Sequence, residues 1–235
     1  RLNWGIELPF DSDYVTYVWF DALINYITAP GFGRDEESFN KWWPASYHLI
    51  GKDILTTHAV YWPTMLMSAG IELPKTIFAH GWWLMGESKM SKSLGNVINP
   101  MDLIDDYGVD PVRYYLMREM VLGQDSSFTM ESFIQRYNSD LANDFGNLLS
   151  RVSTLMKKNY DGKIPEPGDF TEAEALIKSN GESLGEVVKE KIEAMRLNEA
   201  IEEIMQYIRS VNKYMENNAP WKLVKEDKVA GGRDV

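Results

Sequence analysis

A short stretch rich in lysine and serine, residues 89–93, reads KMSKS and is flanked by Gly86 and Gly95. Its two lysines, Lys89 and Lys92, carry compact positive charges on flexible stems and can follow a polyphosphate. This chemistry suits adenylation, in which a carboxylate attacks the α-phosphorus of ATP and negative charge builds on the departing pyrophosphate. Lysine pairs with this spacing are also common in solvated surface loops. The pair is therefore a candidate only if the surrounding sequence supports a nucleotide site.

Three short runs rich in β-branched and aromatic residues predict buried strands. They lie at residues 14–20, 46–50 and 75–80. Residues 53–69 have the length of a helix, with Asp53 as a candidate N-cap and Gly70 as a candidate C-cap. Pro63 should kink this helix, and a shorter helix is expected at 21–28. Strand, helix and strand at this spacing predict a βαβ unit, and hence a parallel sheet with ligands at the carboxyl ends of its strands.

Gly51 and Asp53 lie just after the second predicted strand. A glycine leaves the backbone open to close approach by a ligand, and an acidic side chain at a strand's carboxyl end stands where nucleotides bind in such folds. The alternative for Asp53 is a plain N-cap of the following helix, and one residue can do both.

The pattern becomes helical in the second part of the chain. Pro100 and Pro111 mark the predicted starts of two short helices. From Met130 onward, apolar residues recur at spacings of three and four, which predicts a helix with one apolar stripe. The stripe consists of Leu141, Phe145, Leu148, Leu149, Val152, Leu155 and Met156. A polar linker at 161–170 follows, and a later helix with a second stripe ends before Pro220. The second stripe consists of Ile201, Ile204, Met205, Ile208, Val211 and Met215.

The composition restricts the classes of protein that the chain can be. Hydrophobic residues make up 44% of the 235 residues, enough for packed cores in one large or two modest domains. No apolar stretch approaches the length of a membrane span and no targeting leader stands at the N-terminus, so we expect a soluble, cytoplasmic protein. Cysteine is absent, and His48, His58 and His80 are not spaced as ligands, so we expect no zinc in this chain.

The formal net charge of −11 argues against a protein that binds nucleic acid over its whole surface, because phosphate contacts need lysine and arginine. The charge is uneven: residues 147–163 carry four basic residues and one acidic, whereas 172–203 carry nine acidic and four basic. In the basic segment, Asn147 and Arg151 stand four residues apart on the face opposite the apolar stripe. An amide and a guanidinium can read unstacked RNA bases there, and an ordinary polar helix face is the alternative.

The stretch 89–93 is identical to the KMSKS signature loop of class I aminoacyl-tRNA synthetases. Further segments resemble the methionyl-tRNA synthetases among them, and the similarity covers most of residues 4–157. These segments are YVWFDALINYI (17–27), YHLIGKDI (47–54), HAVYWPTMLMSAG (58–70), FAHGW (78–82), KMSKSLGNVINP (89–100) and YGVDPVRYYLMRE (107–119).

The resemblance implies an α/β fold followed by an all-α fold, in three modules. Residues 1–95 would be the second half of a Rossmann-type parallel-sheet nucleotide-binding domain. Residues 96–129 would be a short helical connecting module, and 130–235 a helical-bundle anticodon-binding domain.

The resemblance also implies roles for residues of the catalytic part. Lys92 would stabilise the transition state of adenylate formation, with help from Lys89. ATP binding is implied for Gly51, Asp53, Met90, Ser91, Lys92 and Ser93. Methionine binding needs an apolar, polarizable pocket for the thioether. It is implied for Trp19, Ala22, Tyr26, His58 and Trp62, whose spacing alone is equally typical of core residues. Thr57 and Leu23 replace an aromatic residue and a proline that some relatives carry.

For the helical part, the resemblance implies anticodon binding by Asn147, Arg151 and Trp221, with the indole as a stacking platform. A tryptophan packed within the bundle is the alternative. The implied function is the ligation of L-methionine to tRNA(Met) through methionyl adenylate, with ATP and Mg²⁺.

The His-x-Gly-His signature, which class I synthetases carry in the first half of the nucleotide fold, is missing, and the chain starts at Arg1. We therefore expect a piece of a longer enzyme, with the first half of the same enzyme as its partner, and no adenylation by the 235-residue chain alone. Two alternatives stay open. One is another class I synthetase, for leucine, isoleucine, valine or cysteine, and the other is a non-catalytic tRNA-binding module derived from such an enzyme.

Overall fold

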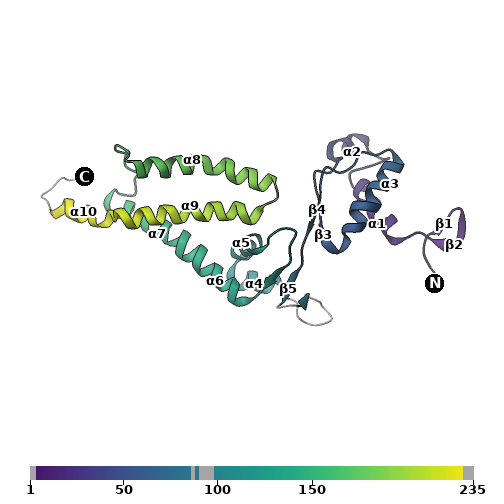
Figure 1. Ribbon diagram of the computed structural model, residues 1–235, viewed down its shortest axis with the longest axis horizontal. Coiled ribbons are helices and arrows are strands. Elements are labelled where there is room, and N and C mark those ends of the chain that lie inside the picture. Colours follow the sequence, from purple (N-terminus) through teal and green to yellow (C-terminus); the bar gives the residue numbers. More distant parts are fainter. Residues whose placement is uncertain (1–3, 86–87, 90–97, 230–235) are drawn as a thin grey trace. The chain divides into compact units, whose positions relative to one another are not determined.

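The protein divides into two compact units, Arg1–Trp82 and Trp83–Val235. The computed structural model describes residues 4–85, 88–89 and 98–229. Figure 1 labels most of their helices and strands. The division into three modules that the resemblance implies stays a prediction.

The first unit contains a β-hairpin, a parallel pair of strands and several helices (Figure 1). Its elements are β1 (Glu7–Leu8), β2 (Asp11–Val15), α1 (Val18–Thr28), α2 (Glu36–Trp42), β3 (His48–Gly51), the 3-10 turn η1 (Lys52–Ile54), the π-helical turn η2 (Thr57–Tyr61), α3 (Trp62–Ala69) and β4 (Ile77–His80). β3 and β4 run parallel, with His48 opposite Ile77 and Gly51 opposite His80. This confirms the predicted βαβ unit.

The predicted strand at 14–20 is wrong in its second half. β2 ends at Val15, and Val18 already begins helix α1. The helical period prevails because it places Leu23 and Ile27 on one face, where they are 1% and 6% exposed. Short aromatic and β-branched runs fit either period, so the local sequence could not decide between them.

The segment predicted as one kinked helix at 53–69 consists of a 3-10 turn, a π-helical turn and an α-helix. Asp53 is not the N-cap of this segment. The first turn begins at Lys52, and its N-cap position is Gly51. The N–H of Trp62 reaches the carbonyl of Thr57, five residues back. Pro63 explains this wider turn, because proline has no N–H to donate and its ring crowds the preceding turn of an α-helix. Gly70 ends the helix with φ 69°, as predicted.

The core of the first unit lies along the seam between α1 and α3. Its buried residues are Leu23, Ile27, Trp43, Trp62 and Leu66. The indole N–H of Trp43 donates to the carbonyl of Glu72 at 2.8 Å, so this large side chain buries no unsatisfied donor.

The second unit combines a small sheet with a series of helices (Figure 1). Its elements are β5 (Trp83–Met85), β6 (Ser88–Lys89), α4 (Pro100–Tyr107), α5 (Val109–Glu119), β7 (Ser126–Phe128), α6 (Met130–Arg136), the π-helical segment η4 (Tyr137–Gly146), α7 (Asn147–Asn159), α8 (Glu172–Glu193), α9 (Leu197–Asn218) and α10 (Pro220–Val229). Helix α4 begins at Pro100 as predicted, with the Asn99 side chain accepting from the N–H of Met101. Helix α5 begins at Val109, shortly before the predicted Pro111.

The two predicted apolar stripes have different outcomes. In α9, Met205, Ile208 and Met215 are buried, which confirms most of the second stripe, whereas Ile204 is 37% exposed. In the first stripe, Phe145 and Leu149 are 50% and 60% exposed, so this stripe is only partly buried. The π-helical segment η4 widens the turns in the middle of the predicted stripe, so a pattern read at α-helical spacing no longer follows one face.

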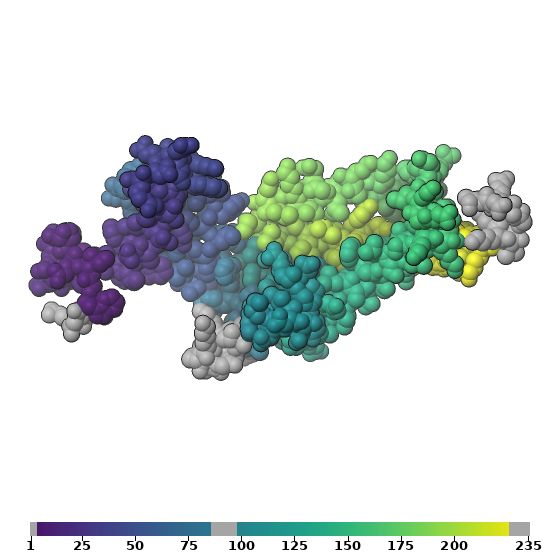
Figure 2. Space-filling model, turned by 180° about the vertical axis from the view of Figure 1, so that it is seen from behind, coloured from purple at the N-terminus to yellow at the C-terminus, as the bar shows by residue number. Residues whose placement is uncertain are grey.

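Helix α8 was not predicted, because its apolar residues are sparse among acidic ones. It lies antiparallel beside α9 (Figure 1), and Figure 2 shows the two in contact in its green and yellow-green part. A signal was present at its start: Thr171 and Glu174 form a capping box. Gly181 allows close approach, since a Cβ there would lie 2.5 Å from the Tyr207 hydroxyl.

A buried carboxylate joins three helical elements of the second unit. Asp140 in η4 is 2% exposed and accepts a hydrogen bond from the Tyr114 hydroxyl of α5 at 2.8 Å. The guanidinium groups of Arg118 and Arg136 each lie 3.5 Å from the same oxygen. Arg118 also pairs with Glu202 of α9. Burial acts to raise the pKa of Asp140, but the hydrogen bonds from tyrosine and serine and the two arginine charges lower it overall.

Replacing Asp140 with asparagine should lower the free energy of unfolding by about 3 kcal/mol, because it leaves buried arginine charge with one carboxylate fewer. Since the folded pKa of Asp140 is lowered, its stabilisation is present above the unfolded value of about 3.9 and is lost as the pH falls through the lowered value. Urea unfolding at pH 7 and pH 3, followed by circular dichroism, should show a smaller acid loss in Asp140→Asn than in the parent chain.

Glu182→Gln is the matched control, because Glu182 pairs with Lys178 at 3.9 Å on the exposed surface of α8. Its effect should stay below about 0.5 kcal/mol. Equal losses of unfolding free energy in both variants would show that the buried network stabilises the fold no more than an exposed ion pair does.

Candidate functional site

Aromatic and imidazole side chains gather where α1 faces the start of α3. The rings of Trp19 and Tyr26 lie 5.9 and 5.6 Å from that of His58, centroid to centroid, and the Trp62 ring lies 6.0 Å from Tyr26. These are four of the five predicted methionine-binding residues. The fifth, Ala22, is exposed on the same face of α1, between Trp19 and Tyr26. The structure brings the five into one region, and their role stays a prediction.

The hydrogen bonds of His58 determine how its ring is protonated when neutral. Its Nδ1 lies 2.9 Å from the carbonyl oxygen of Ile54, which can only accept, so Nδ1 carries the proton. Its Nε2 therefore accepts, and the Tyr26 hydroxyl donates to it at 2.9 Å. His58 is 1% exposed, so this hydrogen bond joins α1 to η2 at a buried side chain.

His48 belongs to the same cluster, although no motif or spacing had marked it as a functional residue. Its ring lies 4.3 Å from the Tyr26 ring, centroid to centroid, at a tilt of 38°, and accepts a hydrogen bond from the Trp62 indole at 3.1 Å. Burial, and next the charge of His58, lower the pKa of His48. The strand pattern at 46–50 could place His48 in a sheet, but not its ring against Trp62.

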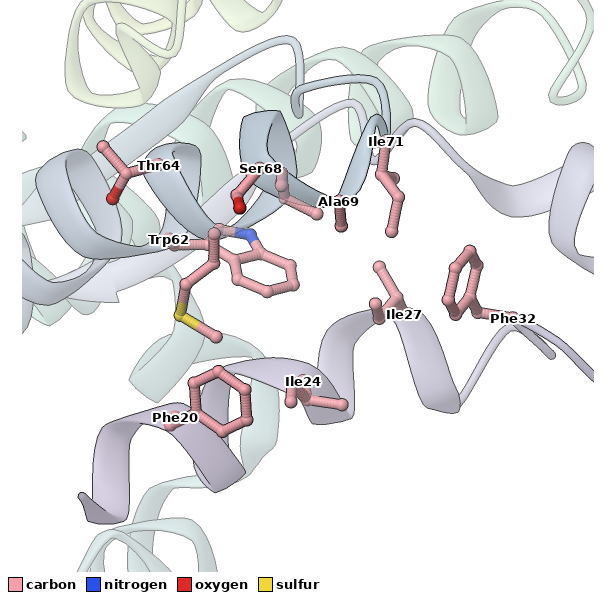
Figure 3. Close-up of a pocket in the computed structure, with 11 residues that line it drawn as sticks. Phe20, Ile24, Ile27, Phe32, Trp62, Thr64, Ser68, Ala69 and Ile71 are labelled. Atoms are coloured by element: carbon pink, nitrogen blue, oxygen red, sulfur yellow. The ribbon is translucent and has the colours of Figure 1, made fainter. Parts of the chain in front are cut away.

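An apolar pocket of about 530 Å³ lies on the other flank of α1 and α3 (Figure 3). Phe20, Ile24 and Ile27 line it from α1, and Ala69 and Ile71 lie on its other side. Trp62 is its one residue in common with the five predicted methionine-binding positions. This pocket therefore lies beside the aromatic cluster, not within it.

The carboxyl ends of β3 and β4 carry a second group of polar and aromatic side chains. A Cβ at Gly51 would lie 2.5 Å from Oδ1 of Asp53, so the carboxylate folds directly over the glycine. The Trp82 indole lies 3.4 Å from the same oxygen, and the Lys52 ammonium stands 4.2 Å from the centre of the Trp82 ring. Gly51 and Asp53 thus lie together at the strand end, as predicted, while Lys52 and Trp82 were not expected there.

The lysine loop is described only at its start. Lys89 is paired through its backbone with Leu84, where β6 runs antiparallel to β5. Met90, Ser91, Lys92 and Ser93 lie outside the described residues.

The second unit holds a pocket of about 360 Å³ between α7, the end of α9 and α10. Arg151 and Trp221, two of the predicted anticodon-binding residues, both line it, together with Lys158 and Lys225. Asn147 is exposed one turn before Arg151 on α7 and does not line the pocket. A partly exposed indole beside three cationic side chains can hold a planar base and the phosphates next to it.

Arg151 pairs with Glu216 at 3.6 Å, and both side chains are exposed. An exposed ion pair of this kind is weak and can exchange for another anion. Lys158 lies in the basic segment noted from the sequence, but Lys225 was missed because only the end of α9 brings α10 to α7.

The described part of the chain has neither a metal-ligand cluster nor a membrane-spanning helix. Among these residues, no group of three or more His, Cys, Asp or Glu side chains is arranged to hold a metal ion. No described helix combines the length and the apolarity needed to cross a membrane.

Residues 1–153 match a family model described as tRNA synthetases class I (M). Curated relatives include the methionine–tRNA ligases of Clostridium acetobutylicum and Thermotoga maritima, which are 48% and 47% identical over 226 and 224 residues. Those alignments cover 96% and 95% of this chain but only 35% and 36% of the relatives.

Solved structures give the same match. Mycobacterium tuberculosis methionyl-tRNA synthetase, in complex with methionyl-adenylate, is 47% identical with a TM-score of 0.87. The match covers 94% of this chain and 44% of that one. The chain therefore spans less than half the length of the proteins it matches.

Gly51→Ala should leave the fold intact but rotate the Asp53 carboxylate away from its position over the glycine, because the added methyl would overlap it. In the full-length protein we expect about tenfold weaker ATP binding by calorimetry, the loss of one charged hydrogen bond. Gly185→Ala on α8, where a Cβ meets nothing within 4 Å, is the control and should bind ATP as the parent does. Unchanged ATP affinity in Gly51→Ala would contradict the prediction that this strand end binds the nucleotide.

Proposed function

Because this chain belongs to the methionine (M) branch of class I tRNA synthetases, we propose that it is part of a methionine–tRNA ligase. The full-length enzyme would activate L-methionine with ATP and transfer it to tRNA(Met). The observation that carries the proposal is the gathering of Trp19, Tyr26, His58 and Trp62 within the unit that also holds Gly51 and Asp53 at a strand end.

The aromatic cluster suits a thioether substrate. Methionine offers dispersion and sulfur–aromatic contacts but almost no hydrogen bonding. Rings from two helices provide polarizable surface, and the Tyr26 hydroxyl already donates to His58, which keeps that polar group satisfied. We propose that Trp19, Ala22, Tyr26, His58 and Trp62 bind the methionine side chain.

The polar group at the carboxyl ends of β3 and β4 would take the nucleotide. The Asp53 carboxylate can accept hydrogen bonds from ribose hydroxyls, and Gly51 allows the close approach that this requires. Met90, Ser91 and Ser93 would border the nucleotide with the two lysines of their loop. Mg²⁺ would enter as the counterion of ATP, and no zinc is proposed for this chain.

In the proposed reaction, the methionine carboxylate attacks the α-phosphorus of ATP and pyrophosphate leaves. Lys92, helped by Lys89, would neutralise the charge that builds on the phosphate oxygens during this step. A terminal ribose hydroxyl of the tRNA then attacks the carbonyl carbon of the adenylate, an ester forms and AMP leaves.

The proposal places the first half of the nucleotide site in another part of the same enzyme. Among the described residues, β3 and β4 pair with each other alone, although parallel sheets are normally larger and covered on both faces. Leu49 in β3 is 62% exposed, as expected for a face that further structure covers. Residues 1–95 would then complete the nucleotide domain, and a cytoplasmic location belongs to the same proposal.

The second unit would bind tRNA(Met), with 96–129 as the connecting module and 130–235 as the anticodon-binding domain. Arg151 and Trp221 share a pocket with two lysines, and Asn147 is exposed one turn away. We propose that all three named residues contact anticodon bases, Trp221 by stacking and the other two by hydrogen bonds.

Lys92→Ala in the full-length enzyme should slow adenylate formation about 100-fold, because one cation that faces developing phosphate charge is lost. ATP–pyrophosphate exchange with methionine measures this step, and the KM for methionine should change less than about twofold. Lys189→Ala, on the exposed surface of α8, is the control and should have the parent rate. An unchanged exchange rate in Lys92→Ala would contradict the assigned role.

Trp221→Ala should raise the KM for tRNA(Met) in charging by about tenfold or more, the value of one stacked base. Methionine-dependent exchange without tRNA should stay as in the parent enzyme. Leu223→Ala is the matched control, since Leu223 is exposed on the same helix and does not line the pocket. Equal charging kinetics in both variants would show that the pocket does not bind the anticodon.

A further inference from the structure

We propose that His48 is a positioning residue for the amino-acid pocket, which it serves by holding the indole of Trp62 in place. The inference rests on the proposed function, because it concerns the site proposed for methionine. His48 makes its contribution through Trp62 and is not itself among the residues proposed to touch the substrate.

The buried indole needs an acceptor. Trp62 is 1% exposed, and its Nε1–H is a donor only. Nε2 of His48 lies 3.1 Å from it, inside the core. A buried donor that loses its acceptor keeps the full cost of leaving water, so the indole would turn to find another partner.

The backbone and ring of His48 are both held. Its N–H donates to the carbonyl of Thr76 at 2.8 Å, at the start of the parallel ladder between β3 and β4. Its ring lies 4.3 Å from the Tyr26 ring, tilted by 38°, and 6.2 Å from the Trp43 ring, centroid to centroid. With the ring fixed on two sides, Nε2 can present its lone pair in one direction, toward Trp62.

The two buried imidazoles, His48 and His58, therefore have the same role: each accepts a hydrogen bond from an aromatic side chain. His58 accepts from the Tyr26 hydroxyl, and His48 accepts from the Trp62 indole, each through Nε2. The groups facing the His48 ring are Tyr26 from α1, Trp43 beyond α2, His58 from η2 and Trp62 from α3. Burial, the largest cause, lowers the pKa of His48, which favours the neutral ring that can accept.

The test uses three substitutions of His48 in the full-length enzyme. The amide oxygen of glutamine reaches the position of Nε2, so His48→Gln keeps an acceptor for Trp62. The shorter His48→Asn places its oxygen near the position of Nδ1, where it cannot reach the indole. His48→Phe keeps a ring against Tyr26 but has no acceptor at all.

We expect His48→Asn and His48→Phe to raise the KM for methionine about tenfold in ATP–pyrophosphate exchange, the effect of one unsatisfied buried donor. His48→Gln should stay within about threefold of the parent, and the KM for ATP should change less than about twofold in all three. Equal methionine KM values for the Asn and Gln variants, or equal changes in the KM values for methionine and ATP, would overturn the proposal. If His48→Phe does not fold, the comparison of methionine KM values between His48→Asn and His48→Gln still tests the proposal.

A second background isolates the hydrogen bond from the rest of the packing. Trp62→Phe removes the donor, so in that background His48→Asn and His48→Gln should have the same methionine KM within about twofold. A persistent difference would mean that His48 acts independently of Trp62. Parent enzyme that activates another amino acid in place of methionine would refute the proposed function, whereas an active parent without the Asn and Gln difference would refute only this inference.

Discussion

The first unit depends on giving acceptors to two donors, the buried indole N–H of Trp62 and the partly buried hydroxyl of Tyr26. The indole N–H would cost about 1–3 kcal/mol if left without a partner in the apolar seam between α1 and α3. The acceptors are the imidazoles of His48 and His58, which come from β3 and η2. The donors and acceptors lie on four different elements: one hydrogen bond joins β3 to α3, and the other joins η2 to α1. Three of these four rings, those of Tyr26, His58 and Trp62, would face the substrate, so the proposed specificity and the stability of the core share the same contacts.

A buried carboxylate has the comparable place in the second unit. Asp140 joins η4 to α5, and Arg118 extends the network to Glu202 on α9. Such a network is costly to break at one member, because the remaining charges stay buried. η4 continues directly into α7, the helix that carries Arg151. The network therefore holds the base of the helix whose other turns line the basic pocket with Trp221.

The two units divide the proposed chemistry between apolar and charged surfaces. Aromatic side chains dominate the cluster proposed for methionine, where hydrogen bonding to the substrate is of little use. Cationic side chains and an indole line the pocket proposed for RNA, in a chain whose net charge is −11. Local positive charge on an acidic chain favours contact at one place and disfavours binding over the whole surface.

The sequence by itself determined the features that depend on local periods and end signals. The βαβ unit, the helix end at Gly70, the start at Pro100 and the buried stripe of α9 followed from spacing and from residues with restricted backbones. The resemblance to a known family added the candidate residues, of which the structure gathers the aromatic set. Only the tertiary structure decided which period residues 18–20 follow, where the π-helical turns lie and that His48 accepts from Trp62. These features depend on partners distant in the chain, because burial and hydrogen bonds between separate elements exist only once those elements have packed.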